Sequence, residues 1–177
     1  GLVVPGYDGI SIRPLKDNGK PPQVLPGSRE LGAFCSTSGR AVLIRHWPDY
    51  RRSIELVIPG LAPRELHLGE QAVLGVSCNG SGEQIWAVLG VWQGRRSQHE
   101  LVQFDSEGSV LRRRNLDPWT IIPGTGVEHN PVDNTLLMTL TKSDLKSGRA
   151  ALIDADTLKL KKVMEEPIKE ALWLPSG

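Results

Sequence analysis

The stretch GVSCNGSGEQIWAV, residues 75–88, contains a short strand-like run, a small polar turn and a second, more apolar run. The same order recurs in AFCSTSGRAVLI at 33–44 and in VEHNPVDNTLLMTL at 127–140, and ALWLPSG at 171–177 supplies the first half of a fourth copy. The central turn residue returns after 43, 52 and 43 residues, at Gly39, Gly82, Asn134 and Gly177. A period in the forties with four short strands per unit is typical of β-propeller blades.

The sequence outside these copies also predicts strands. Runs rich in β-branched and aromatic residues are bounded throughout by Gly, Pro, Ser, Asn or Asp, as short strands are. The best helical candidate, 161–172, is interrupted by Pro167. FDSEGSVL and IDADTLKL, around Asp105 and Asp154, predict matching tight turns, and the insertion at 115–126 accounts for the long middle interval. We expect an all-β chain.

Four repeats predict a single four-bladed propeller of four short antiparallel strands per blade. The expected blades span 28–69, 70–116 and 122–165, with the last built from 167–177 plus 1–27. In that last blade the C-terminal LWL would be the innermost strand and LVVP, residues 2–5, its partner, so that the two ends close the ring and leave no free sheet edge there. The alternatives are a fragment of a larger propeller, or a half that dimerises into an eight-bladed one. The expected state is therefore a monomer or a homodimer.

The turns STSG, NGSG, NPVDN and LPSG resemble degenerate forms of the S-P-D-G turn of TolB-like propeller repeats, which are related to WD repeats. The resemblance covers essentially the whole chain, but Pro is missing at Thr37 and Gly80. It implies a short, self-contained TolB-like propeller. The implied function is a non-catalytic scaffold for protein–protein interaction, in the periplasm or secreted. A counterpart of the separate domain that TolB carries is not expected.

Loops between the second and third strands of propeller blades project from one face. HWPDYRRS at 46–53 and VWQGRRSQ at 91–98 share a Trp followed by two arginines and a serine. Trp, Tyr and Arg supply much of the binding energy at protein interfaces. We expect a contact surface made of Tyr7, Trp47, Tyr50, Arg51, Arg52, Trp92, Arg95, Arg96 and Trp119. The plainer alternative is that each Trp caps the edge of its own blade and the arginines are ordinary solvated turn residues.

In each repeat, one residue lies just before the inner turn, and these four residues are expected to surround the propeller axis. They are Cys35, Cys78, His129 and Trp173. The two cysteines could be buried thiols. They could form a disulfide, as expected if the protein is extracytoplasmic. They could also bind zinc together with His129, although no fourth ligand and no zinc-motif spacing is evident. We therefore expect no metal and no cofactor.

Composition narrows the classes of partner. Lys plus Arg total 21 and Asp plus Glu 20, so the net charge of +1 draws the chain neither to nucleic acid nor to an anionic membrane. The apolar runs are too short to span a bilayer, and membrane insertion is not expected. The basic stretches 112–114 and 159–162 are expected on outermost strands, where such residues guard free edges.

The sequence contains no nucleophile elbow, phosphate-binding glycine loop or HExxH pair, so an enzyme is not expected. Two functions from different classes follow. The first is a scaffold that binds a protein partner. The second is binding of a small molecule or glycan at the axial mouth, including the lyase or lactonase chemistry that some propellers perform there.

Overall fold

The computed structural model describes residues 2–6, 9–13, 23–93, 96–121, 126–142 and 147–168. Every regular element in these ranges is a β-strand, so the all-β prediction is confirmed. None of the described segments is a helix long and apolar enough to cross a membrane. The strands are β1(Leu2–Gly6), β2(Gly9–Arg13), β3(Gln23–Pro26), β4(Arg29–Cys35), β5(Arg40–His46), β6(Arg52–Val57), β7(Arg64–Gly69), β8(Ala72–Cys78), β9(Gln84–Gln93), β10(Arg96–Asp105), β11(Val110–Asn115), β12(Thr120–Ile121), β13(Val127–Asn130), β14(Thr135–Thr141), β15(Gly148–Asp154) and β16(Leu160–Ile168).

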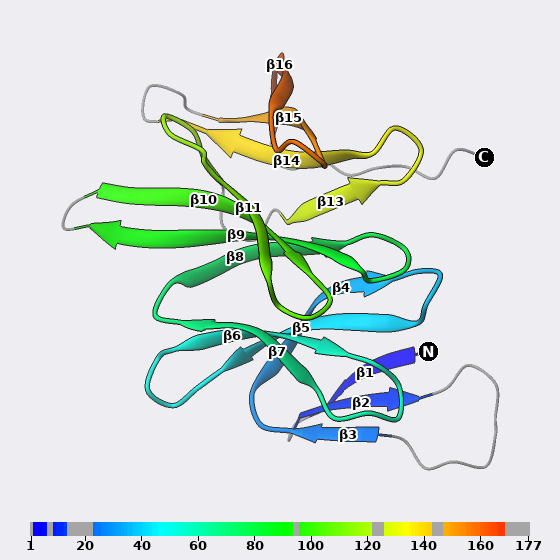
Figure 1. The fold of residues 1–177 in the computed structure, drawn as a ribbon. Coiled ribbons are helices and arrows are strands. Elements are labelled where there is room, and N and C mark those ends of the chain that lie inside the picture. Colours follow the sequence, from blue (N-terminus) through cyan, green and yellow to red (C-terminus); the bar gives the residue numbers. More distant parts are fainter. Residues whose placement is uncertain are drawn as a thin grey trace.

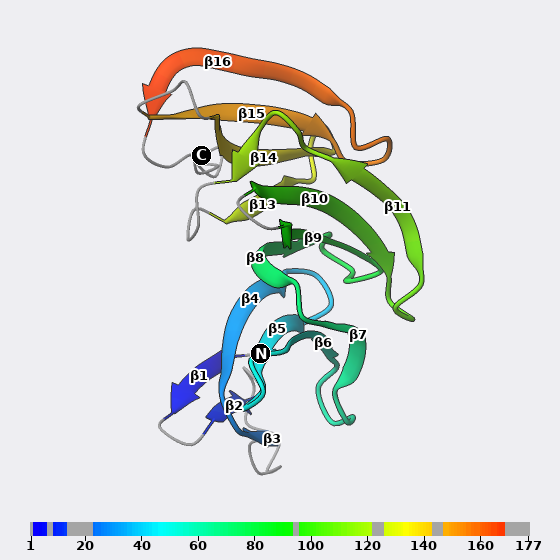
Figure 2. The same ribbon diagram turned by 90° about the vertical axis from the view of Figure 1, so that its left-hand side faces the viewer.

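These strands form four antiparallel sheets that follow one another in chain order, from β1–β3 at one end to β12–β16 at the other (Figures 1 and 2). The two complete middle sheets are ordered β4-β5-β6-β7 and β8-β9-β10-β11. In the last sheet β14 pairs with β13 and β12 on one side and β15 on the other. The run 171–174, which the sequence predicts as the partner of β1, lies outside the described residues.

The inner hairpin turns follow the repeat. Gly39, Gly82 and Asn134 all have positive φ, at 70°, 71° and 51°. Gly and Asn adopt this left-handed conformation at the lowest cost, which is why these residue types recur at one position of the repeat. In Figure 1 these three turns project to the right, whereas strands β9 and β14 end on the left. The molecule therefore has a turn face and an opposite loop face.

The outer hairpins around Asp105 and Asp154 also match. The backbone N–H groups of Glu107 and Ser109 donate to Asp105 Oδ1, and the N–H and hydroxyl of Thr157 donate to Asp154 Oδ1. Bonds from Thr157 hold the pKa of Asp154 at about 2, and the N–H of Ser109 likewise lowers the pKa of Asp105. Both carboxylates are thus charged acceptors that fix tight turns.

Three apolar cores separate the four sheets, because side chains alternate along each strand. In β9, Ile85, Ala87 and Leu89 enter the core shared with β4–β7, whereas Trp86 and Val88 enter the core shared with β12–β16. A third core lies between β1–β3 and β4–β7. The middle strands are consequently apolar on both faces. The outermost strands β11 and β16 are mostly exposed, which explains their lysines and arginines.

Candidate functional site

The loop that joins β5 to β6 has one aromatic side chain packed on the protein and one in solvent. Trp47 is half-buried: its Nε1–H donates to Ser53 Oγ at 3.1 Å, and the Arg45 guanidinium lies 3.6 Å from the ring centroid. Tyr50 is 94% exposed and has a φ of 65°. Its backbone N–H donates to Trp47 O, and Trp47 N–H donates to Arg51 O, both at 3.0 Å. The loop is therefore a closed turn that presents Tyr50.

The two arginines that the sequence groups with Trp47 differ in their contacts. Arg51 forms an ion pair with Asp49 at 2.7 Å and lies 5.9 Å from the Trp47 ring centroid. Arg52 instead donates to the carbonyl of Val73 on the neighbouring sheet, at 3.3 Å. Arg52 thus joins two sheets, and Tyr50 and Arg51 are the members of this loop that remain available to a partner.

The other predicted contact residues are only partly described. Tyr7 and Arg95 lie outside the described residues, and so do the side chains of Trp92 and Arg96. The backbone places Trp92 within β9 and Arg96 within β10, where Trp92 pairs with Ser97. Trp119 is half-buried, packs against the core beside β14, and has the Lys142 ammonium 5.1 Å from its ring centroid. It belongs to a separate part of the surface.

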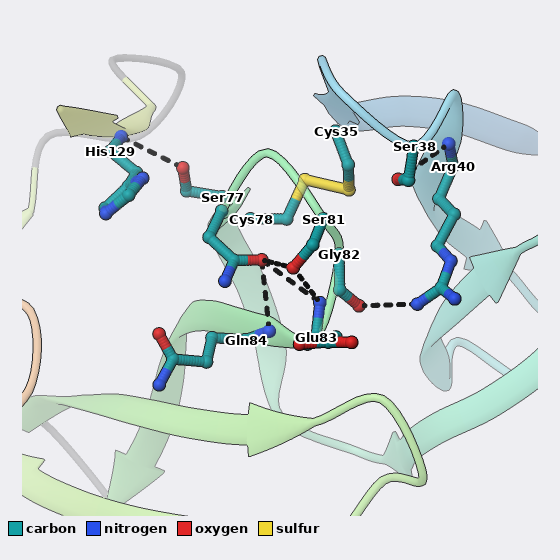
Figure 3. The surroundings of a disulfide bond; sticks show 11 residues. Cys35, Ser38, Arg40, Ser77, Cys78, Ser81, Gly82, Glu83, Gln84 and His129 are labelled. Carbon is teal, nitrogen blue, oxygen red and sulfur yellow. Dashed lines mark hydrogen bonds between the residues drawn. A yellow bond between two sulfur atoms is a disulfide. The ribbon is translucent and has the colours of Figure 1, made fainter. Parts of the chain in front are cut away.

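A disulfide joins Cys35 at the end of β4 to Cys78 at the end of β8, with a Cα–Cα distance of 5.7 Å (Figure 3). Of the three alternatives for the cysteines, the structure therefore contains the disulfide, whose sulfurs are not thiolate ligands for zinc. Around the bond, Thr37 and Ser38 N–H groups donate to Gly80 O, and Arg40 donates to Gly82 O. The inner turns of two sheets are thereby tied together.

His129 occupies the equivalent place on β13, and its contacts extend the same arrangement to the fourth sheet. Its backbone N–H donates to Ser77 Oγ at 3.1 Å (Figure 3). Its ring stacks on Trp86 at 4.7 Å and its Nε2 lies 2.9 Å from Asn134 Oδ1. His129 is a packing residue in this geometry. The fourth predicted member of the ring, Trp173, lies outside the described residues.

A groove of about 430 Å³ runs between the three inner strands β4, β8 and β13. Its walls combine apolar groups, such as Phe34, with the polar side chains of Ser36, Thr37, Ser77 and Glu128. The sequence places the cysteines and His129 here but does not indicate the three hydroxyl residues Ser36, Thr37 and Ser77 as site residues. Their place in the repeat could have indicated them, because each polar residue of the groove lies within two residues of Cys35, Cys78 or His129.

The basic stretches pair mostly within their own sheet, which fits their assignment to outer strands. Arg113 contacts Glu100 at 3.3 Å, Arg112 donates to Gln103 and Lys161 contacts Asp154 at 3.1 Å. Arg114 differs from Arg112 and Arg113 because its guanidinium has no hydrogen bond or ion pair to a described residue. The sequence does not distinguish Arg114 from these two neighbours.

The described part of the chain contains no group of three or more His, Cys, Asp or Glu side chains able to hold a metal ion. Comparison of the chain with models of known protein families and with curated protein sequences finds no match. Any function must therefore be inferred from the geometry and the sequence pattern.

Proposed function

We propose that this chain is a non-catalytic, TolB-like β-propeller that binds a protein partner outside the cytoplasm through its loop face. The observation that carries this proposal is Tyr50. Its side chain is 94% exposed, and its backbone is held at a positive φ, a strained conformation of the kind that clusters at functional sites.

The loop beneath Tyr50 supports a protein partner in particular. Two backbone hydrogen bonds close the turn, Trp47 packs under it, and the Asp49–Arg51 ion pair orders its rim. A rigid aromatic anchor loses little conformational entropy on binding. Because Tyr50 projects from the surface rather than into a pocket, it suits insertion into a partner's cavity.

The disulfide supports the proposed location. Disulfides persist in oxidising compartments such as the periplasm or the extracellular space, and thiols are kept reduced in the cytosol. The Cys35–Cys78 bond is consistent with such a compartment, and both cysteines of the sequence are used in it.

Closure of the four sheets into a ring is supported by a contact that recurs between inner strands. Gly32 lies against Val76 of the next sheet, where an added Cβ would collide with the valine side chain, and a Cβ at Gly75 would lie 3.2 Å from Val127. Gly126, just before β13, is the equivalent residue of the fourth sheet, and an added Cβ there would meet no described atom within 4 Å. Residues 171–174 are in phase to occupy that position.

If residues 171–174 close the ring, a second disulfide can be engineered between them and the sheet that contains β13. Cys35 and Cys78 hold the same place on neighbouring inner strands, and His129 and Trp173 are in phase with them. The double variant His129→Cys, Trp173→Cys is therefore expected to form a second, intramolecular disulfide under oxidising conditions, measured by mass spectrometry of the unreduced protein.

The control is Val132→Cys with Trp173→Cys, because Val132 lies at the tip of the turn and 86% of its side chain is exposed. This pair should not bond. A covalent dimer in place of the internal bond would instead indicate two chains sharing a larger ring. Two free thiols in the first variant would contradict closure by residues 171–174.

The proposed binding surface is tested by crosslinking capture from cells that express the protein. Wild type and a Val132→Ala variant should capture the same partner, since Val132 is an exposed apolar residue on the opposite face. Tyr50→Ala with Arg51→Ala should reduce capture by about tenfold or more, because anchor residues of this kind commonly contribute over 1 kcal/mol each. Equal capture by all three proteins would show that the loop is not the contact surface.

A second candidate function is binding of a small molecule or glycan in the groove between β4, β8 and β13. The observation that favours it is the 430 Å³ volume lined by hydroxyls and a carboxylate beside the exposed Phe34 ring. Such a mixture of an apolar surface and a few polar groups is typical of ligand sites. Capture of no protein by wild type would favour this candidate.

A further inference from the structure

A second hollow, of about 240 Å³, lies between the end of β11 and the sheet that contains β14, β15 and β16. Figures 1 and 2 both bring the end of β11 close to β14. Apolar side chains from several elements form its walls: Leu116, Trp119, Leu140, Ile153 and Leu160. Leu160 remains 37% exposed, so the hollow has an apolar surface open to solvent. Its volume suits one large apolar side chain.

Arg114 lines this hollow and differs from the two arginines before it. Arg112 donates to Gln103 and Arg113 contacts Glu100, but the guanidinium of Arg114 has no hydrogen bond or ion pair to any residue described by the structure. Arg114 pairs with Leu101 across the two strands, so its side chain lies on the same face of the sheet as Leu101, which is in the core between the third and fourth sheets. It is half-buried there. A guanidinium removed from part of its water without a partner favours an incoming anion.

Two charged residues line the hollow, Arg114 and Asp117. The Asp117 carboxylate is exposed to water at the rim, whereas Arg114 is half-buried. The cation is therefore the less exposed of the two lining charges, which favours an anionic ligand.

The segment that forms one wall is held in place before any ligand binds. Leu116 N–H donates to His99 O, Trp119 N–H to Leu116 O, and Ile121 N–H to His99 Nδ1, at 2.8 to 2.9 Å. His99 is buried, and burial lowers its pKa, so the imidazole nitrogen is a neutral acceptor near pH 7. A preorganised wall reduces the entropy lost on binding.

We propose that this hollow binds an apolar carboxylate, in which a side chain of about the size of leucine or phenylalanine is joined to one carboxylate group. Arg114 pairs with the carboxylate and the apolar walls enclose the side chain. The same chemistry is presented by a free organic acid and by the C-terminal residue of a polypeptide. The site is separate from the Tyr50 loop and does not depend on it.

Binding of isocaproate to the full chain, followed by isothermal titration calorimetry, tests the proposal. Wild type should bind with a dissociation constant of about 1 mM or tighter, and isocaproamide should bind at least about tenfold more weakly because it lacks the charge. Arg114→Gln should weaken isocaproate binding by a similar factor. Arg113→Gln is the matched control, since Arg113 lies on the opposite face of β11, and it should bind as wild type does.

Failure of wild type to bind at about 10 mM would overturn the proposal, as would equal binding of the acid and the amide. Equal binding by Arg114→Gln and wild type would also overturn it, provided that both unfold at the same temperature. Titration with a short acetylated peptide that ends in leucine shows which of the two sources supplies the carboxylate, a chain end or a small acid. If it binds with a free but not an amidated C-terminus, the site accepts chain ends; if only isocaproate binds, it accepts small acids.

Discussion

Replacing Trp86 with alanine is expected to lower the free energy of unfolding by about 3 to 5 kcal/mol, the usual cost of deleting a buried aromatic ring. Trp86 is fully buried, its ring stacks on His129, and its Nε1–H donates to Ala155 O at 3.0 Å. It therefore connects the third sheet to the fourth through both packing and a hydrogen bond. Thermal unfolding should show a fall in Tm of about 10 °C or more.

Trp86→Phe separates the two contributions. It keeps an aromatic ring in the core but removes the donor to Ala155 O, so a smaller loss of about 1 to 3 kcal/mol is expected. Val132→Ala, at an exposed turn, should change stability by less than about 0.5 kcal/mol. A loss for Trp86→Ala no larger than that of the turn variant would mean that this inter-sheet contact contributes nothing to folding.

The second large effect concerns the disulfide. The bond links cysteines 43 residues apart, and the chain-entropy relation gives a stabilisation of about 4 kcal/mol for a loop of that length. The variant Cys35→Ala with Cys78→Ala is expected to lose about this amount, measured by urea unfolding. Wild type in excess reductant should shift toward the same midpoint, because the bond restricts the same unfolded chain.

Thiol titration provides the check on the bond itself. The chain contains two cysteines, and neither is free in the structure. Unfolded, unreduced wild type made under oxidising conditions should therefore react with no thiol reagent, and reduced protein should show two thiols. Two reactive thiols before reduction would show that the bond does not form in solution, and the double alanine variant would then lose little stability.

Strand positions and turns could be predicted because their causes are local. Alternating or continuous apolar runs specify strands, and Gly39, Gly82 and Asn134 supply the backbone conformation that the inner turns need. Asp105 and Asp154 accept the hydrogen bonds of their own turns within five residues. These features recur in the same order at intervals of 43 to 52 residues, so the repeat could be found without knowing how the sheets pack.

The contact surface was harder to predict, because the contacts of an individual side chain depend on the neighbouring strand or sheet. The sequence pattern does not indicate Arg45, on β5, yet its guanidinium covers Trp47. The pattern predicts Arg52 at the contact surface, but its guanidinium reaches a carbonyl of the neighbouring sheet. The pattern groups Tyr50 with Trp47, whereas Tyr50 is in solvent and Trp47 is half-buried.

The amino-acid sequence alone specified an all-β chain, its repeat and the residues of its turns, since each follows from propensities within a few neighbouring positions. The tertiary structure was needed to pair Cys35 with Cys78, to separate Arg114 from Arg112 and Arg113, and to reveal the groove between β4, β8 and β13. These features join residues from different strands or sheets. Their burial and charge pairing arise only when the sheets stack, because packing places distant segments in contact and removes water between them.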